Sequence, residues 1–170
     1  MKKTLIERIE VTEPAGRAEI EFTSIPQSYT DLHLLLSLRS TESGVTTATL
    51  DLNLATPTAR WLRGNGATPS SNTTNELLFN GSTTTANTFS NVSVYIPNYT
   101  STTQKSGSVD LIVENNTAAT SVYQYLYALY WNVNAVTSLR LTDDYGSFVQ
   151  YSSASLYGIT AGNDGVTTVS

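Results

Sequence analysis

The segment FTSIPQSYTDLHLLLSLRS, residues 22–40, carries the clearest structural pattern in the chain. Pro26 interrupts its first part, and the residues that follow, 31–39, place a leucine at every second position. Successive side chains of a strand point to opposite faces, so this spacing puts four leucines on one face of a β-sheet. Burial of each contributes about 1.5 to 3 kcal/mol, so a second layer has to cover them. The four are Leu32, Leu34, Leu36 and Leu38.

The same period of two recurs along the chain, and no segment keeps helical spacing over three turns. It predicts strands in residues 3–11, 17–23, 47–54, 76–79, 89–97, 105–114, 121–131, 136–141, 148–151 and 155–159. Residues rich in Gly, Asn, Ser and Thr predict long loops at 63–75 and 80–88, and turns at 98–104 and 115–120. We expect residues 3–11 and 17–23 to form a hairpin, and residues 47–54 to pair antiparallel with the leucine strand.

Many short strands separated by turn residues are typical of a sandwich or a barrel. The strands alternate with loops long enough to pass from one sheet to the other. We therefore predict an all-β fold, a jelly-roll-like antiparallel β-sandwich. A single domain is expected over residues 1–160, followed by a C-terminal tail at residues 161–170.

The composition narrows the class of function. The chain of 170 residues has no cysteine, which excludes disulfides and thiolate metal sites. Its formal net charge of -5 argues against binding to a phosphate backbone, so no nucleic-acid partner is expected. The longest apolar run, residues 125–131, is too short to cross a bilayer, so no membrane partner is expected either. Few charged side chains and many serines and threonines suit strands and solvated loops.

Groups for catalysis are few. His33 is the only histidine, and although Asp31 lies on the same face of its strand, no Gly-x-Ser-x-Gly motif supplies a nucleophile. Asp143 and Asp144 are adjacent in a turn, where aspartate is favoured because its side chain binds the local backbone. We therefore predict that the chain is not an enzyme and has no catalytic, cofactor-binding or metal-binding residues.

Aromatic residues give the only candidate interaction sites. In residues 121–131 one strand face carries the interface candidates Tyr123, Tyr125, Tyr127 and Trp131, while the other face is also largely apolar. Three interpretations are open: core packing, a subunit interface or a platform for stacking sugars. Trp61 and Arg63 stand at the start of the long loop as candidates for binding through that loop, although packing beneath it is the commoner role of such a tryptophan.

Four segments resemble small structural proteins of tailed bacteriophages: FTSIPQSYTDLHLLLSLRS, RWLRGNG, NTFSNVSVYIPNYTSTTQKS and SLRLTDDYGSFVQYSSASLYGI. The resemblance spans about residues 5–159 and includes the Ser-Ile-Pro before the leucine strand, the Ile-Pro-Asn-Tyr turn and the Leu-Tyr-Gly-Ile end. It implies a jelly-roll virion domain that is commonly trimeric, used as a capsid decoration (cement) protein or as a module of a head or tail fibre. It carries no catalytic residues.

These observations predict a virion protein on the outer surface of a phage head, where it braces subunits of the major capsid protein. A homotrimer would hide the tyrosine face. The alternative is a fibre or carbohydrate-binding module that recognises host surface glycans through its polar loops and Trp61 or the tyrosines. A glycan-cleaving enzyme is the third hypothesis, but the sequence offers it no convincing pair of acids.

Overall fold

The computed structural model describes residues 2–64, 68–113 and 123–160, and these form twelve strands in two antiparallel sheets without a helix. The large sheet has the order β1-β12-β3-β8-β9-β10-β5-β6 and the small sheet the order β2-β11-β4-β7. The bounds in the large sheet are β1 Lys2–Glu10, β12 Ser153–Thr160, β3 Asp31–Leu38, β8 Ser90–Ile96, β9 Lys105–Val113, β10 Tyr123–Trp131, β5 Thr58–Gly64 and β6 Ser70–Asn72. Those in the small sheet are β2 Glu19–Phe22, β11 Leu139–Asp143, β4 Val45–Leu52 and β7 Glu76–Asn80.

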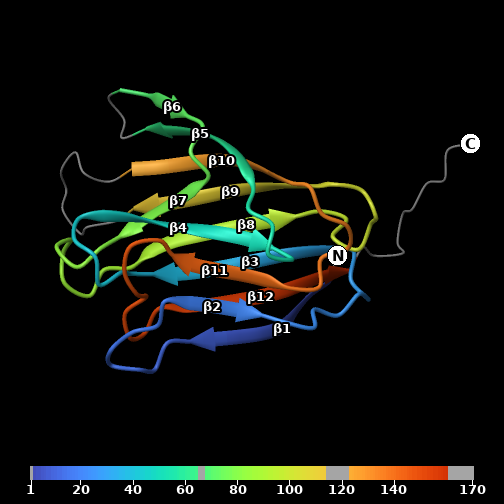
Figure 1. Ribbon diagram of the computed structural model, residues 1–170, viewed down its shortest axis with the longest axis horizontal. Coiled ribbons are helices and arrows are strands. Elements are labelled where there is room, and N and C mark those ends of the chain that lie inside the picture. The colour runs from blue at the N-terminus through green and yellow to red at the C-terminus, as the bar shows by residue number, and fades with distance from the viewer. Residues whose placement is uncertain (1, 65–67, 114–122, 161–170) are drawn as a thin grey trace, which may run out of the picture.

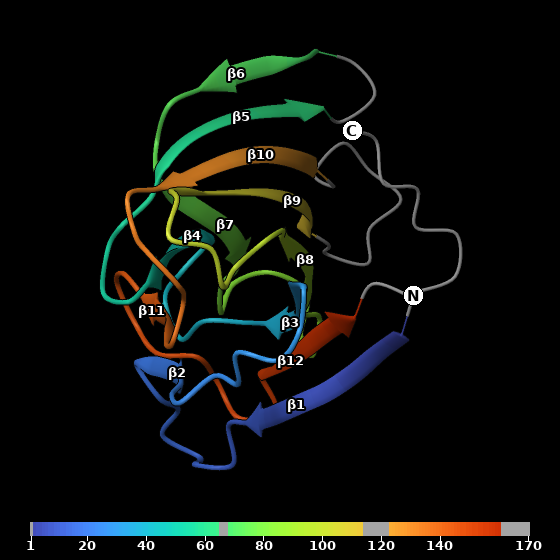
Figure 2. The same ribbon diagram turned by 90° about the vertical axis from the view of Figure 1, so that its right-hand side faces the viewer.

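The two sheets pack face to face as a sandwich (Figure 1). Most connections cross from one sheet to the other, and only β5–β6 and β8–β9–β10 are consecutive neighbours within a sheet. The large sheet extends past the small one, so that β10, β5 and β6 curl over its edge (Figure 2). The predicted all-β, jelly-roll-like antiparallel sandwich of one domain is therefore confirmed. The expected tail at 161–170 and the expected turn at 115–120 lie outside the described residues.

The leucine strand forms as predicted and lies inside the large sheet as β3, between β12 and β8. All four of its alternating leucines are buried. They belong to one core cluster with Ala48, Leu50 and Leu52 of β4 in the opposite sheet. The covering layer required by these leucines is therefore the small sheet.

Two predicted strand pairings are wrong. β1 pairs with β12 and β2 with β11, so the expected N-terminal hairpin does not form. β4 pairs with β11 and β7, so it lies opposite the leucine strand and not beside it. The period of two identifies the buried face of a strand but contains no information on its neighbours. In each case the connecting turn carries the chain across to the other sheet.

Two smaller predictions also differ from the structure. The long loop after β5 contains a three-residue strand, β6, which pairs with β5. The expected strand at residues 148–151 is absent, because Phe148 forms only isolated bridges, to Arg17 and Ser40. The rest of that segment turns back on itself before β12 begins.

Two buried cations hold the loops that flank β8. Arg39 donates to the carbonyl oxygens of Ser82 (2.9 Å) and Thr88 (3.0 Å) in the loop before β8. Lys105 donates to the carbonyl oxygens of Ser101 (2.8 Å) and Thr103 in the loop after it. Neither cation forms an ion pair with a described residue, so carbonyl dipoles satisfy these charges in place of carboxylates. Burial lowers the pKa of Lys105.

Candidate functional site

The aromatic candidates from two distant parts of the sequence meet in one pair of strands. β10 pairs antiparallel with β5, which places Tyr127 opposite Trp61 and Tyr125 opposite Arg63. This pair lies where the large sheet extends beyond the small one (Figures 1 and 2). Because alternate side chains point to opposite sides, the pair has an inner face toward the small sheet and an outer face away from it.

The inner face of this pair is an aromatic cluster. Trp61 lies 5.5 Å from Tyr125 and 6.5 Å from Tyr127 between ring centroids, and the two tyrosine rings stack at 6.0 Å. Tyr125 is 1% exposed, Tyr127 3% and Trp131 0%. The proposed tyrosine interface is therefore corrected: of the three interpretations, core packing holds for these three residues. Tyr123, at the start of β10, is partly buried against the same core.

The polar tips of the cluster are bound within the chain. The indole Nε1 of Trp61 donates to Thr74 Oγ1 (2.9 Å), and the hydroxyl oxygen of Tyr127 accepts from the backbone N–H of Leu78 (3.4 Å). Burial raises the pKa of the Tyr127 phenol well above its usual value of 10. These bonds tie the end of the large sheet to β7 and to the segment that precedes it. Trp61 thus packs beneath the long loop and does not stand at its mouth.

Arg63 holds the edge strand in place. Its guanidinium lies 5.0 Å from the ring centroid of Tyr123 and 5.8 Å from that of Trp61, and its Nε donates to Ser70 Oγ (2.7 Å) in β6. The pKa of the Arg63 guanidinium is raised, mainly by its hydrogen bond to the Tyr125 hydroxyl. Arg63, which the sequence suggested for binding through the loop, therefore contacts aromatic rings and β6 within the chain.

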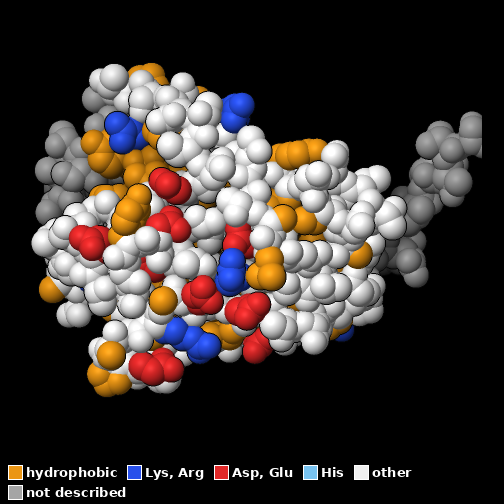
Figure 3. All heavy atoms as spheres, in the orientation of Figure 1, with side chains coloured by type: hydrophobic (Ala, Val, Ile, Leu, Met, Phe, Trp, Pro, Cys, Tyr) orange, Lys and Arg blue, Asp and Glu red, His pale blue; other side chains and the backbone are white. Residues whose placement is uncertain are grey.

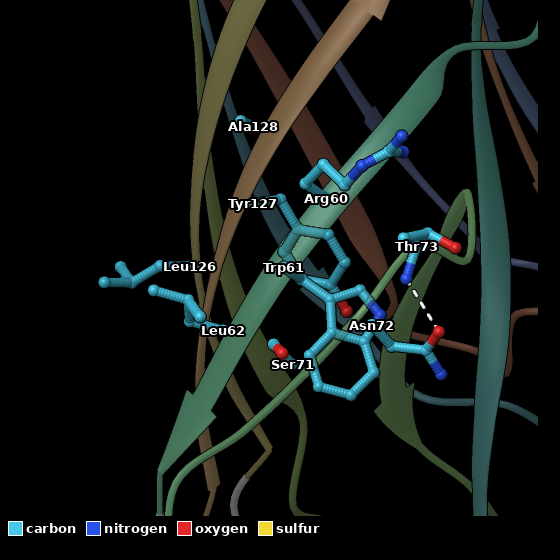
Figure 4. A pocket seen from close by; sticks show the side chains of 9 residues that line it. All are labelled: Arg60, Trp61, Leu62, Ser71, Asn72, Thr73, Leu126, Tyr127 and Ala128. Carbon is cyan, nitrogen blue, oxygen red and sulfur yellow. Dashed lines mark hydrogen bonds between the residues drawn. The ribbon is translucent and has the colours of Figure 1, made fainter.

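The outer face of the same strands forms a shallow groove that the sequence analysis missed. Its volume is about 640 Å³, and its lining consists of residues 60–62 of β5, 71–73 at β6 and 126–128 of β10. Leu62 and Leu126 lie opposite each other in register, with exposed fractions of 61% and 51%. Figure 4 shows both leucines pointing away from the side on which Trp61 and Asn72 lie. Arg60 is the charged residue of the groove.

This groove continues into the uncovered outer face of the large sheet. Tyr130 of β10 and Tyr95 of β8 are also exposed there, and no described strand lies over them. Ser106 and Ser108 of β9 lie in register between Tyr130 and Tyr95, so the apolar part of this face is the groove around Leu62 and Leu126. Exposed apolar residues gathered in this way are typical of an interaction site. The pattern that could have found it is present in β10, where the face with Gln124 and Ala128 is the less apolar of the two.

His33 lies near the middle of this outer face without the geometry of a triad. Its Nε2 is 2.8 Å from Ser93 Oγ, whereas the carboxylate of Asp31 accepts from the Tyr95 hydroxyl (2.8 Å) and the Asn98 N–H (2.9 Å). Burial, and secondarily the charge of Lys3, lowers the pKa of His33. The backbone N–H groups of paired central strands are used in the sheet, so they cannot form an oxyanion hole beside Ser93.

The adjacent acids of the last tight turn serve the fold. Asp143 accepts from the Ser40 hydroxyl (2.6 Å) and from the N–H of Gly146 (3.0 Å). Asp144 accepts from the hydroxyls of Thr47 and Thr49 on β4, both at 2.9 Å. The two carboxylates thus bind different partners and do not face each other across a cleft. Within the described ranges, no group of three or more His, Asp or Glu side chains could hold a metal ion.

Comparisons with family models, with curated proteins and with solved structures give no match to this chain. The resemblance to phage virion proteins therefore remains a hypothesis based on the quoted segments. In the part of the chain that the structure describes, no helix is long and apolar enough to cross a membrane. The candidate site is thus defined by its geometry alone: an apolar groove on an open sheet face.

Proposed function

We propose that this chain is a structural protein of a phage virion that attaches to the outer surface of the head and braces subunits of the major capsid protein. The observation that supports this most is the open face of the large sheet, where Leu62 and Leu126 are exposed side by side. Burial of such residues against a partner is favourable because it removes apolar area from water. The resemblance of four sequence segments to virion proteins suggests the identity of that partner.

The distribution of charge suggests how the protein is oriented. The small sheet has a strongly acidic outer face (Figure 3), with Glu19, Glu21, Asp51 and Glu76 around Arg140. On the outer face of the large sheet, bases and acids balance: Lys3, Arg8 and Arg60 against Glu10, Asp31 and Asp110. Docking through the balanced face buries little uncompensated charge, and it leaves the acidic face in solvent.

The proposal includes a homotrimer, as the resemblance implies. Its subunit contacts have to use surfaces other than the tyrosine face, because Tyr125, Tyr127 and Trp131 are buried within one chain. Light scattering of the purified protein measures this directly. A mass three times that of the chain supports the trimer, and a monomer at micromolar concentration contradicts it.

The attachment is tested by co-sedimentation of the purified protein with empty phage heads that lack it. We expect saturable binding by the unchanged protein and loss of binding by the double variant Leu62→Asp/Leu126→Asp. The matched control is Glu19→Gln/Glu21→Gln, which changes the opposite face and should bind as the unchanged protein does. Circular dichroism and urea unfolding show that each variant is folded.

Three outcomes would overturn the proposal. The unchanged protein fails to sediment with heads, the folded leucine variant binds equally well, or the glutamate variant alone loses binding. The last outcome would place the contact on the small sheet. Saturable binding that requires the two leucines supports both the head partner and the face that contacts it.

A further inference from the structure

A second pocket lies at the end of the sandwich, away from the β5–β10 groove. It has a volume of about 600 Å³ and forms where β4 ends, β9 begins and β10 ends. This volume is within the range usual for small-molecule sites. All of its lining residues are uncharged: Asn53, Thr102, Thr103, Gln104, Asn132, Val133 and Asn134.

The lining determines which ligands suit the pocket. A carboxamide offers both a donor and an acceptor, and a hydroxyl does the same. The hydroxyl groups of a neutral sugar present this same combination. A charged ligand finds no counter-charge in this pocket. The neighbouring Lys105 is only 1% exposed, and its ammonium donates to the carbonyl oxygens of Ser101 and Thr103.

The walls of the pocket are fixed by bonds within the chain. Asn53 Oδ1 accepts from the N–H groups of Thr137 (2.9 Å) and Ser138 (3.1 Å), and its Nδ2 donates to the carbonyl of Ala135 (2.9 Å). Its φ of 49° lies in the left-handed region, which asparagine tolerates better than most residues. Asn53 thus joins the end of β4 to the loop after β10, and this lowers the ordering cost of binding.

Other polar groups of the lining are available to a ligand. Gln104 Nε2 donates to Asn132 Oδ1 (3.2 Å). This bond does not use the side-chain oxygen of Gln104 or the NH₂ group of Asn132. Among the described residues, no hydrogen bond is formed by the Asn134 amide or the Thr102 hydroxyl. Val133, between the two asparagines, supplies an apolar contact for the C–H groups of a sugar ring.

We propose that this pocket binds a neutral saccharide. Gln104, Asn132 and Asn134 hydrogen bond to its hydroxyl groups, and the site is independent of the apolar groove that is proposed to contact the head. The protein then carries two surfaces with different lining residues, one for the virion along β5 and β10 and one for a glycan just beyond the end of β10. Each surface can be removed without the other.

The test is to titrate the full chain with oligosaccharides and to measure binding by isothermal calorimetry and by changes in amide chemical shifts. The probes are maltotriose, lactose and N,N′-diacetylchitobiose, with sialyllactose and a heparin tetrasaccharide as charged comparators. We expect at least one neutral probe to bind and to shift the amides of residues 102–104 and 132–134. The affinity for that probe should weaken about five- to tenfold in Asn132→Ala and by a similar factor in Asn134→Ala, because each variant loses one hydrogen bond.

The control is Asn91→Ala, an exposed asparagine near the opposite end of β8, which should leave the affinity unchanged. The leucine variant of the β5–β10 groove should also bind the sugar normally, so a failure of head attachment and a failure of this site are separable. The inference is overturned if no neutral probe shifts these amides, if the two asparagine variants bind as well as Asn91→Ala, or if a charged comparator binds more tightly than every neutral probe.

Discussion

The inner face of the large sheet packs on the small sheet and on its own aromatic cluster, whereas no described element covers the outer face. The contrast is sharpest in β10 and β5. Trp61 and Tyr127 are buried and hydrogen bonded on one side. Their sequence neighbours Leu62 and Leu126 are exposed on the other side. Apolar side chains on these strands therefore have two roles. Those inside stabilise the fold, and those outside are available to a partner.

The largest expected effect is that of Trp61→Ala, which removes the centre of the inner cluster. Large-to-small changes of a buried tryptophan cost about 3 to 5 kcal/mol of unfolding free energy. The matched control, Leu62→Ala, changes the next residue on the outer face and should cost no more than about 0.5 kcal/mol. Urea unfolding measures both. Equal losses would mean that the outer face is also covered in the folded protein.

A smaller loss is expected for Tyr127→Phe, which keeps the ring and removes only the hydroxyl. The N–H of Leu78 then loses its partner, at a cost of about 1 kcal/mol. The same change affects alkaline stability. Burial raises the pKa of Tyr127, so the unfolded chain loses this proton near pH 10 while the folded protein keeps it. Stability therefore falls as the pH rises through 10.

The measurement is urea unfolding at pH 8 and at pH 10.5 for both proteins. Tyr127→Phe should be less stable than the unchanged protein at pH 8, and the difference should narrow at pH 10.5 because phenylalanine cannot ionise. A difference that stays constant across this range would show that the Tyr127 hydroxyl titrates alike in the folded and unfolded states.

The sequence predicts the elements of this comparison better than their arrangement. The period of two identifies the buried leucines of β3 and the apolar strands β4 and β10, because burial on one side is a local property. Which strands are neighbours depends on the path of each connection, so the pairings of β1, β2 and β4 could not be predicted. Strand β6 is too short and too polar to show a pattern.

The site shows the same limit. Tyr125 and Trp61 attract attention because aromatic residues are enriched at interfaces. In β10, however, both faces carry apolar residues, so the presence of aromatic side chains does not by itself show which face is buried. The side with Gln124 and Ala128 has the lower apolar content and remains outside. Relative apolar content of the two faces is therefore the signal in the sequence that points to Leu126.

His33 allows a weaker test on the outer face. The pKa of His33 is lowered in the folded protein, chiefly by burial, so the unfolded chain binds the proton more readily. Stability should therefore fall as the pH decreases through about 6.5, the ordinary value for histidine. The effect is modest because the ring is only partly buried. Unfolding of His33→Gln at pH 7.5 and 5 should show a shallower decline than the unchanged protein, and parallel declines would contradict this origin.

The smallest expected effect is that of Leu62→Ser/Leu126→Ser on the free chain. These side chains already contact water, so their loss removes little buried apolar area, and each change should alter unfolding by no more than about 0.5 kcal/mol. Exposed leucines that do not stabilise the isolated fold are consistent with a role in docking. A combined loss above about 2 kcal/mol would show instead that they pack in the isolated protein, and the distinction between the two faces of β10 would no longer hold.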